Sequence, residues 1–254
     1  MVKELSDREL LRYDKHIILP EFGIEGQLLI KNSSVLVVGA GGLGCPVLQY
    51  LTAAGVGKIG IVEFDMVNES NLQRQILYGS ADKGKLKSII SRDRLNLMND
   101  MVDIELFNIR LNKDNAAKLI SDYNIIVDAT DNYETRYTMN DACVKAGKPL
   151  VHGAIYKYEG QVSVFNYEGG PSYRCYHPES EKSAAHPDPA ESGLLGVLPG
   201  ITGTYMANEV LKMITYKGEV LSGKILVFNI MYNTFYTIDI IKNPDNFNYS
   251  TIDK

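Results

Sequence analysis

Cysteine is scarce in this sequence of 254 residues. The three cysteines, Cys45, Cys143 and Cys175, are scattered and form no C-x-x-C pair. The sequence therefore spells out neither a disulfide framework nor a zinc site, and a reducing compartment suits it.

Long apolar runs are also missing. No stretch approaches the length needed to cross a bilayer, and the charged N-terminal segment MVKELSDRELLRYDKH lacks the apolar region of a signal peptide. An excess of basic charge is absent as well, since the formal net charge is -5, which argues against a general nucleic-acid binder. We expect a soluble cytoplasmic protein.

The composition is that of an ordinary globular protein. Hydrophobic residues make up 45% of the chain and charged residues 22%, which excludes disordered and fibrous classes. The length fits one large α/β domain as well as two small ones, and we favour one domain over 1–254. Within it we expect an N-terminal helical arm (1–30), a nucleotide-binding half (33–150) and an antiparallel half (151–242).

The rest of the chain is organised around the stretch 34–71. Its short β-branched run, 35–38, predicts a strand that is buried on both faces. Gly39, Gly41 and Gly44 follow in G-x-G-x-x-G spacing. This spacing lets the backbone turn tightly, approach a phosphate and enter a helix whose N-terminus favours anions.

A second strand, KIGIVEF, follows the predicted helix and brings in Glu63. An acidic residue about 20 positions beyond the glycines is where a ribose hydroxyl is usually held. The fingerprint alone also fits NAD and FAD enzymes, so a dehydrogenase is an alternative. However, the segment 68–75, NESNLQRQ, offers more polar donors than a dehydrogenase's ribose pocket requires.

The remaining chain alternates predicted helices and strands. We expect helices over 82–99, 115–121, 133–146 and 200–214, and strands over 101–111, 125–132, 149–156, 158–166, 224–230 and 235–241. The alternation at 158–166 is typical of an antiparallel strand with one wet face. The predicted fold class is therefore α/β, a Rossmann-like nucleotide-binding domain with a mixed, largely parallel sheet that ends in antiparallel strands.

Two features of the second half bear on function. The segment 171–193 is rich in Pro, Ser and charge and is typical of a mobile loop. The antiparallel strands around it are a candidate docking face for a partner protein.

Two carboxylates, Asp128 and Asp131, end the predicted strand in IIVDATDN. Because the carboxyl ends of parallel strands border the ligand crevice, these acids are better functional candidates than acids elsewhere. His152 on the next strand is flanked by apolar residues, and we interpret it as a core histidine with its hydrogen bonds satisfied.

Several blocks, in this order, resemble the ThiF/MoeB/HesA family, the prokaryotic relatives of ubiquitin-activating enzymes: RYDKHIILPEFGIEGQ, GAGGLGC, VNESNLQRQ, DATDN and GLLGVLPGITG. The likeness covers nearly the whole chain. It implies ATP-dependent adenylation of the C-terminal glycine of a ubiquitin-like sulfur-carrier protein ending in Gly-Gly. The pathway would be thiamine thiazole, molybdopterin or tRNA thiolation, with a possible sulfurtransferase partner.

Two alternatives stay open beside this reading. The chain could be a family member that activates another carboxylate or a modified tRNA base. It could also be a paralogue that binds ATP or a partner without turnover, as its missing cysteines suggest, although the retained Asn71, Arg74, Lys87 and Asp131 argue against such decay.

The resemblance also implies roles for individual residues. The backbone that receives the phosphates would be that of Gly39, Gly41, Gly42 and Gly44. Glu63 would bind the ribose, and the triphosphate would be bound by Asn71, Arg74 and Lys87. Asp131 would hold the Mg²⁺ that bridges phosphate oxygens. The reaction needs positioning and charge neutralisation rather than a strong base, since a carboxylate is already a nucleophile at pH 7.

Lys15 stands where the family pattern R-Y-x-R-Q has its arginine. The resemblance implies a homodimer in which Lys15 of one subunit reaches the ATP site of the other. A lysine supplies the charge but not the bidentate fork of an arginine. Ser6 and Glu9 form a capping-box pattern, which predicts that a helix begins there. Without the resemblance we would interpret this helix as a solvated surface helix.

The zinc ligands found in many relatives are replaced here. The four aligned positions hold Ser172, Cys175, Asn246 and Tyr249, and a single thiol cannot hold structural zinc. Pro189 occupies the place of a loop cysteine found in some relatives. We therefore expect no structural zinc and no covalent link to the carrier, with Cys175 as the one thiol that could contradict this.

Overall fold

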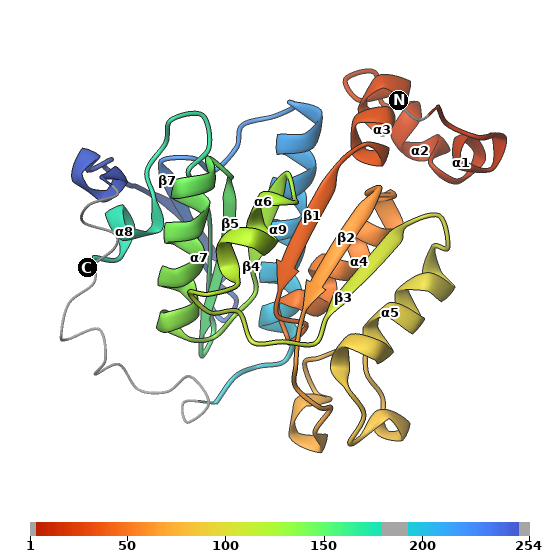
Figure 1. Ribbon diagram of the computed structural model, residues 1–254, viewed down its shortest axis with the longest axis horizontal. Coiled ribbons are helices and arrows are strands. Elements are labelled where there is room, and N and C mark those ends of the chain that lie inside the picture. Colours follow the sequence, from red (N-terminus) through yellow and green to blue (C-terminus); the bar gives the residue numbers. More distant parts are fainter. Residues whose placement is uncertain (1–3, 179–192, 249–254) are drawn as a thin grey trace.

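The computed structural model describes residues 4–178 and 193–248, and one mixed sheet runs through its centre (Figure 1). The strands are β1 (Ser34–Val38), β2 (Lys58–Val62), β3 (Asp103–Phe107), β4 (Ile125–Asp128), β5 (Leu150–Tyr156), β6 (Glu159–Phe165), β7 (Lys224–Asn229) and β8 (Thr234–Asp239). Their order is β3-β2-β1-β4-β5-β6-β7-β8. Strands β1 to β5 are parallel and β6 to β8 join antiparallel, which confirms the predicted fold class.

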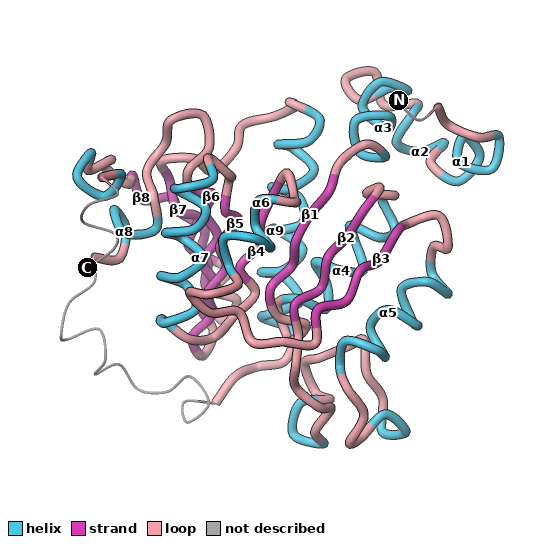
Figure 2. Tube along the Cα trace, viewed as in Figure 1, coloured by secondary structure: helices cyan, strands magenta, loops and turns pink. Residues whose placement is uncertain are grey.

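Helices cover both faces of this sheet (Figure 2). They are α1 (Asp7–Arg12), α2 (Asp14–Ile17), α3 (Gly23–Lys31), α4 (Gly44–Ala54), α5 (Lys87–Met98), α6 (Ala116–Ser121), α7 (Tyr133–Ala146), α8 (Tyr173–Tyr176) and α9 (Val197–Thr215). Among the described residues, no helix is long and apolar enough to span a membrane.

The alternating side chains of β1 explain the two layers. Val35 and Val37 belong to one apolar cluster with α4 and α9, whereas Leu36 and Val38 belong to a second cluster with α6 and α7. A strand that is covered on both faces needs apolar residues at every position, as the sequence predicted for this run.

The order of the strands reverses between β1 and β4, which lie side by side and are parallel. Strands β2 and β3 lie on one side of this pair and β5 to β8 on the other. The helices that follow these strands, α4 and α7, pack on opposite faces of the sheet, and in open α/β sheets ligands bind at the strand ends of such a switch point. Gly39, directly after β1, has a φ of +97°, and a Cβ built there would lie 2.6 Å from the carbonyl oxygen of Ala129 after β4. Only glycine allows so close an approach of the two loops.

Several predicted boundaries are confirmed. Helix α7 spans Tyr133–Ala146 as expected, and α4 ends where Gly55 adopts a left-handed conformation. The capping box at Ser6 and Glu9 is also present. These boundaries could be read from sequence because caps act within a few residues.

The predicted helix over 82–99 begins too early. Helix α5 begins at Lys87, after a short 3-10 turn at Ser80–Asp82. The segment between them pairs with the chain near Val67, whose N–H donates to the Lys85 carbonyl and whose carbonyl accepts from Gly84 N–H. This tertiary pairing overrides the helical propensity of the segment.

The predicted mobile loop over 171–193 is wrong for its first part. Residues Tyr173–Tyr176 form α8, and the Tyr173 side chain is fully buried in the cluster beneath α7. Its ring packs edge-on against Phe165 and Tyr137. The polar residues around Tyr173 in the sequence gave no sign that its ring is buried. Pro189 and the rest of 179–192 lie outside the described residues.

The N-terminal arm docks at the end of the sheet opposite the crevice (Figure 1). Tyr13, buried between α1 and α2, accepts a hydrogen bond from Asn99 at 2.9 Å. Gln27 of α3 donates to the carbonyl of Ala54 at 2.8 Å. Both bonds attach the arm to the carboxyl ends of α4 and α5.

Candidate active site

The glycine-rich loop lies at the carboxyl end of β1, where it enters α4. A Cβ built on Gly44 would lie 2.0 Å from the Gly39 carbonyl oxygen, so the loop closes on itself at this point. A Cβ on Gly41 would meet only the side chain of Gln75, at 3.6 Å. The backbone of the loop is therefore tightly folded yet open beside Gly41, as a loop that receives a phosphate must be.

Glu63 lies at the carboxyl end of β2 with its side chain buried. One carboxylate oxygen accepts a hydrogen bond from Ala40 N–H at 3.0 Å, and the other accepts from Asp65 N–H at 2.8 Å. These bonds fix the carboxylate against the glycine-rich loop. Each oxygen keeps a second lone pair, so Glu63 can still accept from a ribose hydroxyl.

Lys87 begins α5 and is buried, although its side chain is charged. Its Nζ lies 3.2 Å from Oδ2 of Asp65, which follows β2 and is exposed. Burial of an ammonium is costly unless it has a partner, and Asp65 supplies one. The structure thus brings Lys87 to the same sheet end as Glu63 and the glycine-rich loop.

Arg74 and Asn71 lie in the turn that follows β2. Arg74 donates to the carbonyl of Ser70 at 3.0 Å, and its Cδ lies 3.6 Å from a Cβ built on Gly42. Asn71 ends a short 3-10 helix, and its carbonyl accepts the backbone N–H groups of Arg74 and Gln75. The turn therefore holds Arg74 directly above the glycine-rich loop.

The two carboxylates that end β4 lie in different surroundings. Asp131 is exposed at the carboxyl end of the sheet, where a metal ligand is expected. Asp128 is buried and points into the protein, where it accepts a hydrogen bond from His152 at 2.8 Å. The expectation that Asp128 borders the crevice is therefore wrong, whereas the interpretation of His152 as a satisfied core histidine is confirmed.

The charges around Asp128 set its protonation. Burial alone would raise the pKa of Asp128, but the hydrogen bond from His152 and the positive charge of Arg136 hold it below its usual value. Burial lowers the pKa of His152 despite its bond to Asp128. We conclude that Asp128 is ionised and His152 neutral near pH 7.

Lys15 is not part of the site in its own chain. It lies in α2 at the opposite end of the sheet, where 86% of its side chain is exposed and its Nζ pairs with Asp14 at 2.9 Å. Any contact of Lys15 with a bound nucleotide therefore requires a second subunit.

Three of the four positions aligned with zinc ligands come together in space. Cys175 Sγ accepts from Asn246 Nδ2 at 3.5 Å and from Asn243 N–H at 3.3 Å, and it lies 3.5 Å from Ser172 Oγ. Burial would raise the pKa of Cys175, but the hydrogen bonds from Asn246 and Ser172 lower it. Tyr249 lies outside the described residues. Cys175 belongs to α8, and its assignment to a mobile loop is wrong.

Sequence reasoning did not single out Gln75 and Tyr78. Gln75 is buried, and its Oε1 has no hydrogen-bond partner among the described residues. Tyr78 donates to the Ala40 carbonyl at 2.7 Å and so supports the glycine-rich loop from below. The block NESNLQRQ contains Gln75, so proximity to the glycines was the signal available for it. Nothing in the sequence pointed to Tyr78.

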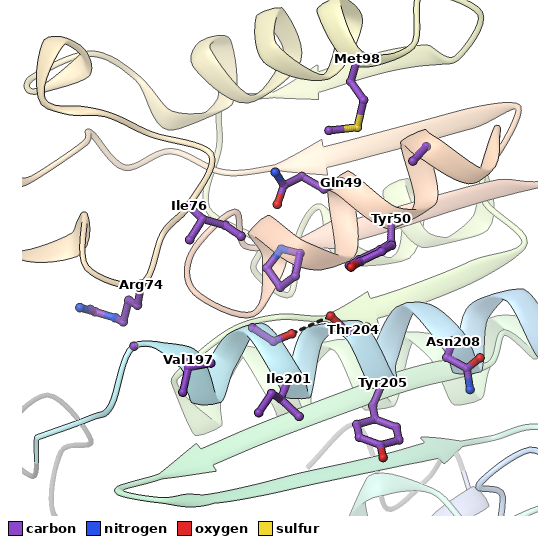
Figure 3. A pocket seen from close by; sticks show the side chains of 14 residues that line it. Gln49, Tyr50, Arg74, Ile76, Met98, Val197, Ile201, Thr204, Tyr205 and Asn208 are labelled. Atoms are coloured by element: carbon purple, nitrogen blue, oxygen red, sulfur yellow. Dashed lines mark hydrogen bonds between the residues drawn. The ribbon is translucent and has the colours of Figure 1, made fainter. Parts of the chain in front are cut away.

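An apolar groove of about 840 Å³ lies between α4 and α9 (Figure 3). Gln49 and Tyr50 of α4 and Val197, Ile201 and Tyr205 of α9 are among the residues that line it. Arg74 and Ile76 reach one end of the groove, which joins it to the turn above the glycines.

Comparisons with known proteins agree with this architecture. The model of the ThiF family matches residues 13–248. A sulfur carrier protein adenylyltransferase of Thermus thermophilus is 47% identical over 94% of this chain and 90% of its own length. The SAMP-activating enzyme E1 of Haloferax volcanii is 43% identical over 96% of this chain and 90% of its own length.

Other relatives are longer or more distant. The probable adenylyltransferase/sulfurtransferase MoeZ of Mycobacterium tuberculosis is 46% identical, and this chain spans 62% of its length. Among solved structures, E. coli MccB with MccA-N7isoASN has a TM-score of 0.82 at 19% identity, covering 92% of this chain and 73% of that one. The latter likeness concerns the fold alone. From the family match and from identities well above 30% over nearly the whole chain, we conclude that the chain belongs to the ThiF family.

Proposed function

We propose that this protein adenylates the C-terminal glycine carboxylate of a ubiquitin-like sulfur-carrier protein with ATP. The observation that carries the proposal is the 47% identity to a sulfur carrier protein adenylyltransferase over nearly the full length of both chains. The site supports it, because an open glycine-rich loop, Arg74 and Lys87 meet at one end of the sheet.

The chemistry asks little of the protein beyond position and charge. An oxygen of the carrier's carboxylate attacks the α-phosphorus, the bond from that phosphorus to the bridging oxygen breaks, and pyrophosphate leaves with the electron pair. Because the carboxylate is already ionised, no general base is required. Arg74 and Lys87 neutralise the charge of the triphosphate, and Asn71 orients it through hydrogen bonds. Glu63, fixed by Ala40 and Asp65, holds the ribose.

Asp131 fits a magnesium ligand. Its side chain is exposed just beyond the carboxyl end of β4, and the two residues before it, Ala129 and Thr130, lie against Gly39. Mg²⁺ prefers one or two carboxylates together with phosphate oxygens and water. A bound Mg²⁺ would neutralise phosphate charge and assist the departure of pyrophosphate.

We further propose that the enzyme is a homodimer in which Lys15 reaches the partner's nucleotide. Lys15 is too far from its own site to contribute there, and its exposed side chain is available to a second chain. The groove between α4 and α9 is a suitable interface, because exposed Tyr50, Ile76 and Val197 line it next to Arg74.

The antiparallel half is the proposed docking face for the carrier. Strand β8 is exposed along its whole length. Phe235 and Tyr236 on it, and Tyr232 in the turn before it, present large apolar surfaces to solvent. Exposed aromatic groups of this kind mark protein interfaces. A sulfurtransferase that acts on the activated carrier is a further proposed partner, in keeping with the two activities in the name of MoeZ.

ATP–pyrophosphate exchange tests the proposal. The purified protein is incubated with MgATP, labelled pyrophosphate and a panel of carriers ending in Gly-Gly. We expect label to enter ATP only with the cognate carrier, since its carboxylate is a reactant. A matched carrier that lacks the final glycine serves as control. Exchange that is equally fast with and without any carrier contradicts the proposal, as does its absence with every carrier from the three pathways.

A further inference from the structure

Asp128 and Arg136 form a buried ion pair beneath the site. Asp128 ends β4 and is almost fully buried, and Nε of Arg136 lies 3.6 Å from its Oδ2. That Nε is itself buried and has no hydrogen-bond partner among the described residues. His152 donates to the same oxygen at 2.8 Å.

A buried ion pair contributes little to the free energy of folding. Desolvation of two charges often costs more than their attraction returns, and apolar residues of similar size would pack at least as well. The three residues before Asp128 are aliphatic and buried, which shows that β4 needs no charge for its own packing. The pair therefore calls for a role beyond stability.

The contacts of the pair converge on Thr130. Asp128 Oδ1 accepts both the backbone N–H of Thr130, at 3.0 Å, and its hydroxyl, at 2.6 Å. Arg136 Nη2 donates to the Thr130 carbonyl at 2.9 Å. The backbone N–H and the hydroxyl of Thr130 are thus bonded to Asp128, and its carbonyl is bonded to Arg136.

The residues on either side of Thr130 are fixed as well. Ala129 N–H donates to the Val38 carbonyl at 3.0 Å, and the Ala129 carbonyl touches Gly39. Asn132 caps α7 by accepting from Thr135 N–H at 2.9 Å. Asp131 lies between Thr130 and Asn132 with its own side chain exposed.

We infer that Asp128, Thr130 and Arg136 form a brace that positions Asp131 toward Mg²⁺ and the glycine-rich loop; this rests on the proposed function. The brace residues are positioning residues and touch neither nucleotide nor carrier. A metal ligand must be held within a fraction of an ångström to favour one geometry, and partners behind a ligand commonly change metal affinity 10- to 100-fold.

Thr130→Val tests the brace, because it keeps the shape of the side chain and removes the hydroxyl bonded to Asp128. In the ligand-free protein we expect faster amide hydrogen exchange in the segment 129–132. In calorimetry with ATP, we expect the Mg²⁺ concentration that half-restores tight binding to rise about tenfold. Affinity for ATP without Mg²⁺ should stay within about twofold of the unmodified protein, since the brace acts through Asp131.

Two further variants distinguish positioning from general stability. Thr130→Ser restores the hydroxyl and is expected to restore both measurements. Thr215→Val is the matched control, since it removes a buried hydroxyl that donates to the Leu211 carbonyl at 2.7 Å at the far end of α9. It is expected to lower the melting temperature without changing the Mg²⁺ dependence.

Arg136→Lys provides a second route to the same result. It keeps a positive charge near Asp128 but cannot reach both Asp128 and the Thr130 carbonyl with the planar fork of an arginine. We expect it to raise the Mg²⁺ requirement as Thr130→Val does. This variant decides the matter if Thr130→Val does not fold.

The following results would overturn the brace. They are an unchanged Mg²⁺ requirement in both Thr130→Val and Arg136→Lys, or an equal rise in Thr215→Val. Faster exchange at 129–132 without a change in Mg²⁺ dependence would also overturn it, because the segment would then be held for stability alone. Failure of pyrophosphate exchange with every carrier contradicts the proposed function instead, and leaves the Mg²⁺-dependent binding of ATP to decide on the brace.

Discussion

The inner strands of the parallel half and the edge strand β8 of the antiparallel half use their side chains in opposite ways. In the parallel half, β1, β2 and β4 are buried on both faces, and charged groups near their ends are held by fixed partners. In the antiparallel half, β8 is exposed throughout and carries aromatic rings in solvent. An exposed apolar edge strand is a liability that proteins usually avoid.

This difference fits the proposed division of one domain between two tasks. Charge neutralisation needs polar groups that do not move when phosphate charge develops, and burial in a parallel sheet provides such rigidity. Recognition of a protein needs accessible apolar area, and the edge of the antiparallel half provides it. The predictions below test this division, beginning with the largest expected effect.

Asp131→Asn is expected to lower pyrophosphate exchange by about 10³-fold or more, because it removes the charge that holds Mg²⁺. The side chain is exposed, so the melting temperature should change little. Exchange rate and melting temperature are measured on the same preparation across a Mg²⁺ titration. Normal exchange at limiting Mg²⁺ would remove Asp131 from the site.

Lys15→Ala and Arg74→Ala are each expected to lower exchange about 10²-fold, since each removes a positive charge from the triphosphate. Mixing the two variants should restore activity to about a quarter of the unmodified level. Half of the dimers are then mixed, and each mixed dimer has one intact site. Formation of mixed dimers is verified with two affinity tags. If such dimers are as inactive as their parents, the shared site is wrong.

Tyr232→Ala combined with Tyr236→Ala is expected to raise the KM for the carrier about tenfold, because aromatic anchors dominate binding energy at interfaces. The KM for ATP should not change, since both residues belong to the antiparallel half. Tyr216→Asn, at another exposed tyrosine, is the control. A rise in both KM values would show that the two halves do not divide the tasks.

His152→Asn is expected to reduce the pH dependence of stability. Burial lowers the pKa of His152, so below about pH 6.5 the unfolded chain binds a proton that the folded one does not. The free energy of unfolding therefore falls as the pH drops, by at most about 1.4 kcal/mol per pH unit from this group. Urea unfolding at pH 7 and pH 5.5 should show a smaller loss in the variant. Equal losses would contradict this account.

Cys175→Ser is expected to have no effect on adenylation. With the cognate carrier and ATP, denaturing mass spectrometry without reductant should show no covalent adduct, and metal analysis should show well under one zinc per chain, because one thiol cannot hold structural zinc. The lowered pKa of Cys175 makes this a demanding test, since it favours the thiolate. An adduct lost in Cys175→Ser would overturn the prediction, and stoichiometric zinc would show that the alignment of the tail is wrong.

Much of the parallel half could be predicted because its signals are local. The strand 35–38, the glycine spacing and the caps of α4 and α7 depend on residues within one or two turns of each other. The start of α5 could not be found in this way, because the pairing of Val67 with Gly84 and Lys85 decides it.

The candidate site likewise contains residues that could be predicted from sequence and features that only the structure showed. The glycines and Glu63 were nominated from the motif, and Arg74 and Lys87 from the family resemblance. The structure gathers them at one end of the sheet. The residue pattern alone made Asp128 and Asp131 equal candidates, as two acids in one short motif, and the family resemblance assigned Mg²⁺ to Asp131 only. The structure adds the physical difference, since Asp128 is buried against His152 and Arg136.

The sequence by itself determined the fold class, the position of the glycine-rich loop and the resemblance that led to the ThiF family. These depend on residue type and spacing along the chain, because strands, turns and helix caps are set by residues that are close together in the sequence. The tertiary structure alone decided which carboxylate is buried, that Tyr173 anchors α8 and that Lys15 lies away from its own site. Such facts follow from contacts between residues far apart in sequence, where burial and distance, rather than local pattern, set the energy of a side chain.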